Sequence, residues 1–177
     1  MKKIIALLLA VVMCMSLTAF AETTVENEVI TWADMESAVA EAGLEGEFKT
    51  FEDAGAKIWI PTTLLECELT DEDKADGCLG YFMTEDETSA IAVWYMDLEG
   101  MSIEDYMAAL AEVGATEIEQ CTVNGLTCVS YIVTEDDIAC VDYVADNGYI
   151  LEVTCYPYSD EAFQIVIGAV CASIQAA

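Results

Sequence analysis

The strongest constraint on the fold is a pair of Asn-Gly dipeptides, each placed between two runs that alternate apolar and polar residues. Asn124-Gly125 separates "TEIEQCTV" from "LTCVSYIV", and Asn147-Gly148 separates "IACVDYVA" from "YILEVTCYP". Asn-Gly is typical of two-residue hairpin turns, because both central residues of such a turn need positive φ. With "TEDD" as the turn between the hairpins, the sequence predicts a four-stranded antiparallel meander from about residue 116 to residue 157.

Two-residue turns also fix the register of both hairpins and pair four cysteines. Cys121 then faces Cys128, and Cys140 faces Cys155, which makes Cys121-Cys128 and Cys140-Cys155 candidate disulfides. Both pairs fall at hydrogen-bonded positions, where side chains are farther apart than at the alternate sites. The alternative is that they are buried thiols that behave as small apolar residues. In either case we expect each pair to be cross-strand neighbours.

The same register places two acidic residues of the second hairpin on opposite faces of the sheet. Asp142 faces Val153, and Glu152 faces Tyr143. On a buried face Asp142 would be a carboxyl group in an apolar setting, which is one mark of a functional site. The other interpretation is that a sheet edge or a gap beside a helix lets these acids reach water. Asp142 and Glu152 are therefore the acids to follow, and neither is assigned a catalytic role.

Three helices are predicted by a hydroxyl residue that precedes acidic residues and then an apolar stripe. Thr31 precedes "WADMESAVAEAG", Ser102 precedes "IEDYMAALAEVG", and Ser159 precedes "DEAFQIVIGAVCASI". Strand-like runs "EFKTFE", "AKIWIP", "CLGYFMT" and "AIAVWYMDL" lie between the first two helices. The sequence thus predicts an α+β fold in which helices pack on the faces of an antiparallel sheet.

The first 21 residues have the layout of a secretory signal peptide. Lys2 and Lys3 precede the apolar run "IIALLLAVVM", and small residues in "AFA" precede a cleavage site expected after Ala21. The alternative is a membrane anchor, but the apolar run is at the short end for spanning a bilayer. We expect residues 22–29 to be a short disordered lead, residues 30–177 to be a single globular domain, and the protein to be secreted or extracytoplasmic without a membrane span.

The charge is strongly acidic. Five basic residues, all lysines, oppose 34 acidic residues, and the chain has a formal net charge of −29 and no histidine. Such a field repels nucleic acids and anionic lipids, and the absence of arginine leaves no guanidinium to bind a phosphate or carboxylate substrate. More than half of the residues are hydrophobic, so a packed domain with a solvated acidic shell is expected rather than a disordered chain.

The order of the predicted elements resembles the PsbP-like α/β/α sandwich. The resemblance covers about residues 46 to 175 and depends on "GAKIWIP", on "GMSIEDY", on the Asn-Gly meander and on the closing helix "YSDEAFQIVIGAVCASI". That family includes the photosystem oxygen-evolving accessory protein and small exported bacterial proteins of the DcrB type. The resemblance implies a non-catalytic accessory or binding module, and it transfers no catalytic residue.

The residue inventory excludes several chemistries. Without histidine there is no Ser-His-Asp or Cys-His nucleophile and no histidine-ligated metal. Asp71, Asp73 and Asp76 in "TDEDKADGC" are weak calcium candidates, because an EF-hand loop that starts at Asp71 lacks the required Gly and Glu. We expect no metal and no cofactor. The expected function is an exported binding module for an unknown protein or small ligand, and the alternatives are a hydrolase with two carboxylates and a weak calcium-binding protein.

Overall fold

The computed structural model describes residues 29–177, so the signal-peptide prediction and most of the predicted lead lie outside the described residues. The helices are α2 (Trp32–Glu41), α3 (Asp71–Ala75), α4 (Ile103–Glu112) and α5 (Glu161–Ala172), with a short 3₁₀ turn at Glu52–Ala54. The strands are β1 (Val29–Ile30), β2 (Gly46–Phe51), β3 (Ala56–Pro61), β4 (Leu64–Glu66), β5 (Cys78–Thr84), β6 (Ala90–Asp97), β7 (Thr116–Val123), β8 (Leu126–Val133), β9 (Ile138–Val144), β10 (Tyr149–Tyr156) and β11 (Gln175–Ala176). None of the described helices has the length and apolar content needed to cross a membrane.

The strands form two sheets. The large sheet has the order β1-β7-β8-β9-β10-β6-β5-β4, and the small sheet has the order β11-β3-β2. Strands β7 to β10 are neighbours in sequence and in space, which confirms the predicted meander. Among the strands of residues 29–177, all pairings are antiparallel except that of β1 with β7.

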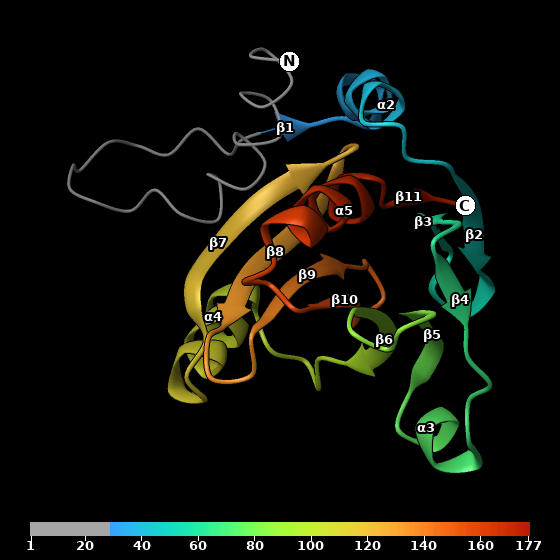
Figure 1. Cartoon of the computed structure of the whole chain (residues 1–177). Coiled ribbons are helices and arrows are strands. Elements are labelled where there is room, and N and C mark those ends of the chain that lie inside the picture. Colours follow the sequence, from blue (N-terminus) through green and yellow to red (C-terminus); the bar gives the residue numbers. More distant parts are fainter. Residues whose placement is uncertain (1–28) are drawn as a thin grey trace.

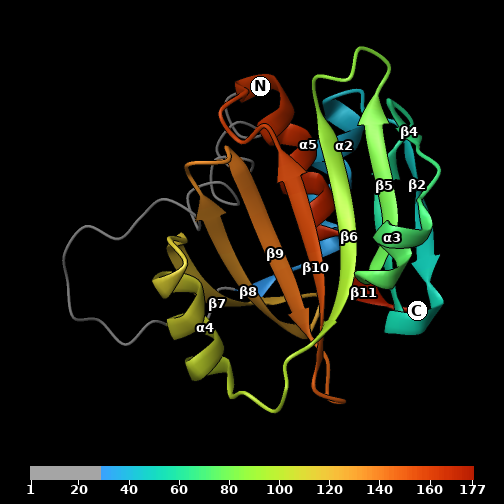
Figure 2. The same cartoon turned by 90° about the horizontal axis from the view of Figure 1, so that it is seen from below.

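Helices cover both faces of the large sheet. Figure 1 shows α5 in the hollow of the large sheet, with the small sheet beside it. We call the face toward α5 the inner face, and its core contains Leu151, Val153 and Ile167. Figure 2 shows α4 against the opposite, outer face near β7, where Leu110 packs with Val129. The α+β fold with helices on both faces of an antiparallel sheet is therefore confirmed.

The predicted helix starts are correct for two helices and wrong for the third. The side chains of Thr31 and Ser102 cap α2 and α4 by accepting from the backbone N–H three residues on. In α5 the capping residue is Asp160, not Ser159, whose hydroxyl and backbone N–H both donate to the carboxylate of Asp137. Because Ser159 is engaged with the β8–β9 turn, the next residue caps the helix.

The two Asn-Gly dipeptides form different turns. Asn124 and Gly125 have φ of 50° and 82°, and Val123 pairs with Leu126, so this is the predicted two-residue turn. In the second hairpin only Gly148 has positive φ, and the Ala145 N–H donates to the Tyr149 carbonyl across a loop of three residues, 146–148. Such a loop, a type I turn closed by a left-handed glycine, shifts the register of β9 on β10 by one residue.

The shifted register corrects the predicted pairing of Cys140 with Cys155. Cys140 pairs with Thr154, and Cys155 pairs with Ala139. Cys140 lies in the outer-face core under α4, and Cys155 lies in the inner-face core with α5, so a bond between them is excluded by the sheet itself. Cys121 does pair with Cys128, as predicted, and a disulfide between these two stays a prediction.

Asn124 ties the first hairpin to two helices. Its side-chain amide donates to the carbonyls of Ala172 and Ile174 at 2.8 Å each, and its Oδ1 accepts from the backbone N–H of Trp32 at 2.6 Å. These bonds satisfy carbonyls at the end of α5 and an N–H at the start of α2, which have no partner within their helices. A single turn residue therefore joins β7–β8, α2 and α5.

We predict that Asn124→Gly lowers the free energy of unfolding by about 3 kcal/mol, because three hydrogen bonds are lost and their partners are left unpaired. Glycine keeps the left-handed backbone, so backbone strain does not contribute. The matched control is Asn147→Gly, whose exposed side chain bonds to Tyr95 and Tyr149, and which should cost less than about 1 kcal/mol. Urea unfolding of both variants measures the difference, and equal losses would contradict the role of Asn124.

Candidate functional site

The shifted register brings Asp142 and Glu152 together. They are direct cross-strand partners between β9 and β10, and both point to the outer face. The prediction that they lie on opposite faces is therefore wrong, for the same reason as the cysteine pairing. Side chains at directly paired positions have Cβ atoms about 4.5–5.5 Å apart, so the two carboxyl groups form one cluster.

Tyrosine and threonine hydroxyls hold the two carboxyl groups. The Tyr106 hydroxyl, from α4, donates to Asp142 Oδ2 at 2.6 Å. The Tyr131 hydroxyl, from β8, donates to Glu152 Oε2 at 2.5 Å, and the Thr154 hydroxyl donates to Oε1 at 3.0 Å. Each residue of this cluster comes from an outer-face position of its strand or from the face of α4 that packs on the sheet.

Asp142 is in an electrostatic environment that opposes its charge. Its side chain is fully buried, and Oδ1 has no hydrogen-bond partner. Burial, and then the charge of Glu152, raises the pKa of Asp142 well above 3.8, while the hydrogen bond from Tyr106 opposes the rise. Burial also raises the pKa of the Tyr106 and Tyr131 hydroxyls, so both remain donors. Burial without a counter-charge therefore favours the protonated, neutral form of Asp142.

This cluster lacks the access that a pair of catalytic carboxylates needs. A glycosidase places its two carboxyl groups on either side of a cleft that admits the sugar and water. Here α4 covers Asp142, and the two pockets described below do not include Asp142 or Glu152. The arrangement can hold α4 against the sheet through the buried hydrogen bond that Tyr106 donates to Asp142.

Between α4, which lies over the β7 side, and α3, which contacts β5, the outer face is open. Figure 2 shows no helix over the middle of β10 and β6, while α4 lies over the β7 side. The outward side chains of β5, β6 and β10 form what we call the open face: Tyr81, Met83, Ala90, Ala92, Trp94, Glu152, Thr154 and Tyr156. Trp94 is directly paired with Glu152 and is partly exposed, and Tyr156 is 45% exposed. Glu152 therefore belongs both to the carboxyl cluster and to the open face, where Trp94 is its partner.

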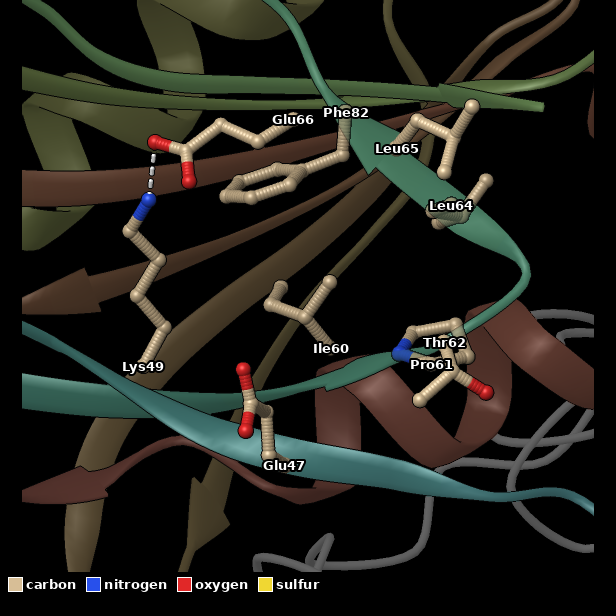
Figure 3. A pocket seen from close by; sticks show the side chains of 9 residues that line it. All are labelled: Glu47, Lys49, Ile60, Pro61, Thr62, Leu64, Leu65, Glu66 and Phe82. Atoms are coloured by element: carbon tan, nitrogen blue, oxygen red, sulfur yellow. Dashed lines mark hydrogen bonds and ion pairs between the residues drawn. The ribbon is translucent and has the colours of Figure 1, made fainter. Parts of the chain in front are cut away.

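A pocket of about 200 Å³ lies between the small sheet and β4 (Figure 3). Ile60, Leu64 and Phe82 form its apolar walls, and the Lys49–Glu66 ion pair spans the gap at one end. The Lys49 ammonium also lies 4.9 Å from the centre of the Phe82 ring. The pocket has room for a small apolar group and brings together no pair of free acids. A second cleft, of about 410 Å³, lies between α2 and β2–β3 beside Trp32 and Trp59.

The weak calcium candidates lie on a short helix rather than in a loop. Asp71 and Asp73 are in α3, and Asp76 is its C-cap. The Asp73 carboxylate accepts from the hydroxyl and the backbone N–H of Thr70, which forms a capping box and lowers the pKa of Asp73. Within residues 29–177, no group of three or more acidic or cysteine side chains is arranged to hold a metal ion. The helix itself was not predicted.

Comparison with known proteins defines the class of the fold. No protein-family model matches the sequence, and no curated protein matches it. The structure is similar to the solution structure of cyanobacterial PsbP (CyanoP) from Synechocystis sp. PCC 6803, with a TM-score of 0.53 and 10% sequence identity over 91% of this chain and 99% of that chain. The fold is therefore PsbP-like, as the element order predicted, and the likeness to the DcrB type stays a prediction.

Sequence reasoning identified Asp142 and Glu152 but missed their partners. Tyr106 lies at an apolar-stripe position of α4, and Tyr131 lies at an outer-face position of β8, where a tyrosine is usually a packing residue. The signal that could have found them is a tyrosine on each element that packs over a buried acid. That inference requires the correct β9–β10 register, which the Asn-Gly dipeptide alone does not decide.

We predict that the stability of the protein falls as pH rises above about 4, because Asp142 holds its proton to a higher pH in the folded than in the unfolded chain. Between the two pKa values the slope from this group is about 1.4 kcal/mol per pH unit. Asp142→Asn keeps the acceptor for Tyr106 and removes the titration, so it should flatten this part of the profile and stabilise the protein at about pH 7. Denaturant unfolding across the pH range measures both effects.

The control for this experiment is Asp105→Asn, an acid in the first turn of α4 that lies on the exposed side of the helix. It should leave the pH dependence of the wild type in place. A wild-type profile that rises with pH, or an Asp142→Asn profile parallel to the wild type, would contradict a neutral buried Asp142.

Proposed function

We propose that this protein is an exported, non-catalytic binding module whose ligand is a basic segment of another extracytoplasmic protein. The proposal of export rests on Lys2, Lys3, the apolar run and "AFA" before residue 22. The observation that carries the proposal of binding is the open face, where Glu152 is directly paired with Trp94 and two tyrosines, Tyr81 and Tyr156, lie on the same face of the sheet.

Charge supports a cationic ligand. The chain has a net charge of −29, and two of its three lysines beyond residue 21, Lys49 and Lys57, lie on the small sheet rather than on the open face. An ammonium or guanidinium over the Trp94 ring gains a cation–π interaction, and the paired Glu152 supplies the counter-charge. Acidic surfaces of this kind also speed the encounter with basic partners.

The burial of Asp142 beneath α4 favours a binding function over a catalytic one. The carboxyl pair is the only feature that supports a hydrolase among the described residues, and its buried member cannot reach a substrate without displacement of α4. The accessible member, Glu152, has hydroxyl donors on both oxygens, which fix its orientation toward the sheet. A fixed carboxylate beside Trp94 is a recognition element that loses little entropy on binding.

We predict that a decapeptide of alternating Lys and Ser binds the protein, and that Trp94→Ala weakens this binding about fivefold, because roughly 1 kcal/mol of cation–π energy is lost. Isothermal titration calorimetry measures both affinities. Binding should weaken as salt rises from about 0.05 to 0.5 M, since the charges are exposed and screened. A decapeptide with Glu in place of Lys should not bind.

The matched control is Tyr149→Ala, a partly exposed aromatic residue of β10 that stacks on Tyr95 outside the open face. It should leave the affinity unchanged. Equal losses for Trp94→Ala and Tyr149→Ala would contradict the proposal, since attraction to the net charge alone would then explain binding. Turnover of a glycoside, peptide or ester that is abolished by Asp142→Asn would establish a hydrolase instead.

A further inference from the structure

Three aromatic rings from three elements meet in the second cleft, between α2 and β2–β3, which we call the aromatic cleft. Trp32 is the first residue of α2, Phe48 is on β2 and Trp59 is on β3. The centre of the Trp32 ring lies 5.4 Å from that of Phe48, with 80° between the ring planes, and 5.7 Å from that of Trp59. Phe48 and Trp59 are direct cross-strand partners, so the three rings form one compact group.

The rings leave space between the helix and the strands. The aromatic cleft has a volume of about 410 Å³, and Phe48 is 38% exposed beside it. Gly46 keeps the strand wall bare, because a Cβ at this position would overlap the six-membered ring of the Trp59 indole. The place of the Trp59 ring in the cleft therefore depends on a residue without a side chain at position 46.

The charged groups that line the aromatic cleft are carboxylates. Glu36, from α2, and Glu45, from the loop before β2, both line the cleft and are both exposed. Among the described residues, none of those that line this cleft is a lysine. The Lys57 ammonium lies 5.4 Å from the centre of the Phe48 ring, so this ring already attracts a cation of the chain. Because the whole chain also has a net charge of −29, the cleft attracts cations and repels anions.

The walls of the aromatic cleft favour a quaternary ammonium over a primary one. Aromatic faces attract a cation within about 6 Å of the ring centre, and Val39 and Leu44 add apolar contacts for the methyl groups around it. A primary ammonium has three N–H donors, which would lose water against rings and aliphatic side chains. A quaternary ammonium has no N–H group, so it needs no hydrogen-bond partner in these walls.

We propose that the aromatic cleft binds a small, free organic molecule that carries a quaternary ammonium group. This site is separate from the open face, whose Trp94 and Glu152 are on the large sheet, so the proposal does not depend on the ligand of that face. A lipid headgroup with the same ammonium also carries a phosphate, which Glu36 and Glu45 would repel. The ligand is therefore a free molecule and not a membrane surface.

NMR titration with choline tests the site. The chain has three tryptophans, so its spectrum has three indole N–H signals, and the spectrum of Trp94→Ala identifies the signal of Trp94. We expect millimolar choline to shift the signals of Trp32 and Trp59 and to leave that of Trp94 in place. The neutral control is the alcohol in which a tert-butyl group replaces the trimethylammonium group. It should bind at least about fivefold more weakly, since it lacks the cation–π interaction.

Three results of this titration would overturn the proposal. The first is that the three indole signals stay in place up to about 50 mM choline, well above the affinity expected for a small cation on aromatic rings. The second is a shift of the Trp94 signal alone, which would place the ammonium on the open face. The third is equal affinity for choline and the neutral alcohol, which would show that the charge is not recognised.

Two exposed residues of the cleft separate the contribution of a ring from that of a charge. Phe48→Leu keeps an apolar side chain and removes the ring, and Glu36→Gln removes a carboxylate. Each should weaken choline binding about two- to fivefold. The matched controls are Tyr149→Leu, on β10, and Glu41→Gln, at the end of α2 outside the cleft, and both should keep the wild-type affinity. Equal losses in the variants and their controls would refute the site.

Vesicles of phosphatidylcholine distinguish a lipid headgroup from a free ligand. When these vesicles are sedimented, the protein should remain in the supernatant, because the phosphate of each headgroup is repelled by the carboxylates of the cleft. Retention of the wild type on the vesicles that is lost in Phe48→Leu would show that the headgroup is the ligand, and would overturn the assignment to a free molecule.

Discussion

The register of β9 on β10 decides which side of the large sheet each side chain of the second hairpin faces. Successive residues of a strand point to opposite faces of the sheet. A shift of one residue in the pairing therefore changes which residues of β9 lie on the same face as a given residue of β10. The loop at residues 146–148 sets this register through the left-handed Gly148. Val153 and Cys155 therefore share the inner face with Val141 and Ala139 of β9, and Glu152 is placed opposite Asp142.

The unfavourable free energy of burying the Asp142 carboxyl group is offset by its contacts with the elements that cover it. A charged Asp142 with an unpaired oxygen would be strongly unfavourable in this core, and the group keeps its proton instead. The neutral acid still accepts from Tyr106, which gives α4 a directional contact in addition to its apolar packing. On the outer face, α4 covers the part that contains Asp142, and no helix covers the part around Trp94. The boundary between these two parts is Glu152.

Much of the fold could be predicted from local signals, and the failures concern features that local signals do not decide. Thr31 and Ser102 cap helices as expected, and Asn124-Gly125 forms the expected turn, because each signal acts within a few residues. Asn147-Gly148 is compatible with a two-residue and a three-residue loop, and the structure contains the three-residue loop. Strand β4 has three residues and pairs with β5 only in the folded chain, so no periodicity marks it. The tyrosine hydroxyls that donate to Asp142 and Glu152 come from α4 and β8, respectively. These contacts arise only from tertiary packing.

The central claim is that the β9–β10 register buries Asp142 as a neutral acid beside Glu152. The most direct test is a ¹³C NMR titration of the Asp142 side-chain carboxyl, assigned by comparison with Asp142→Asn. The account predicts that the carboxyl group keeps its proton to a pH well above the ordinary aspartate value and titrates with a raised midpoint. A midpoint near the ordinary aspartate value of 3.8 would show that Asp142 is solvated or charged, and would contradict both the register and the sealed cluster.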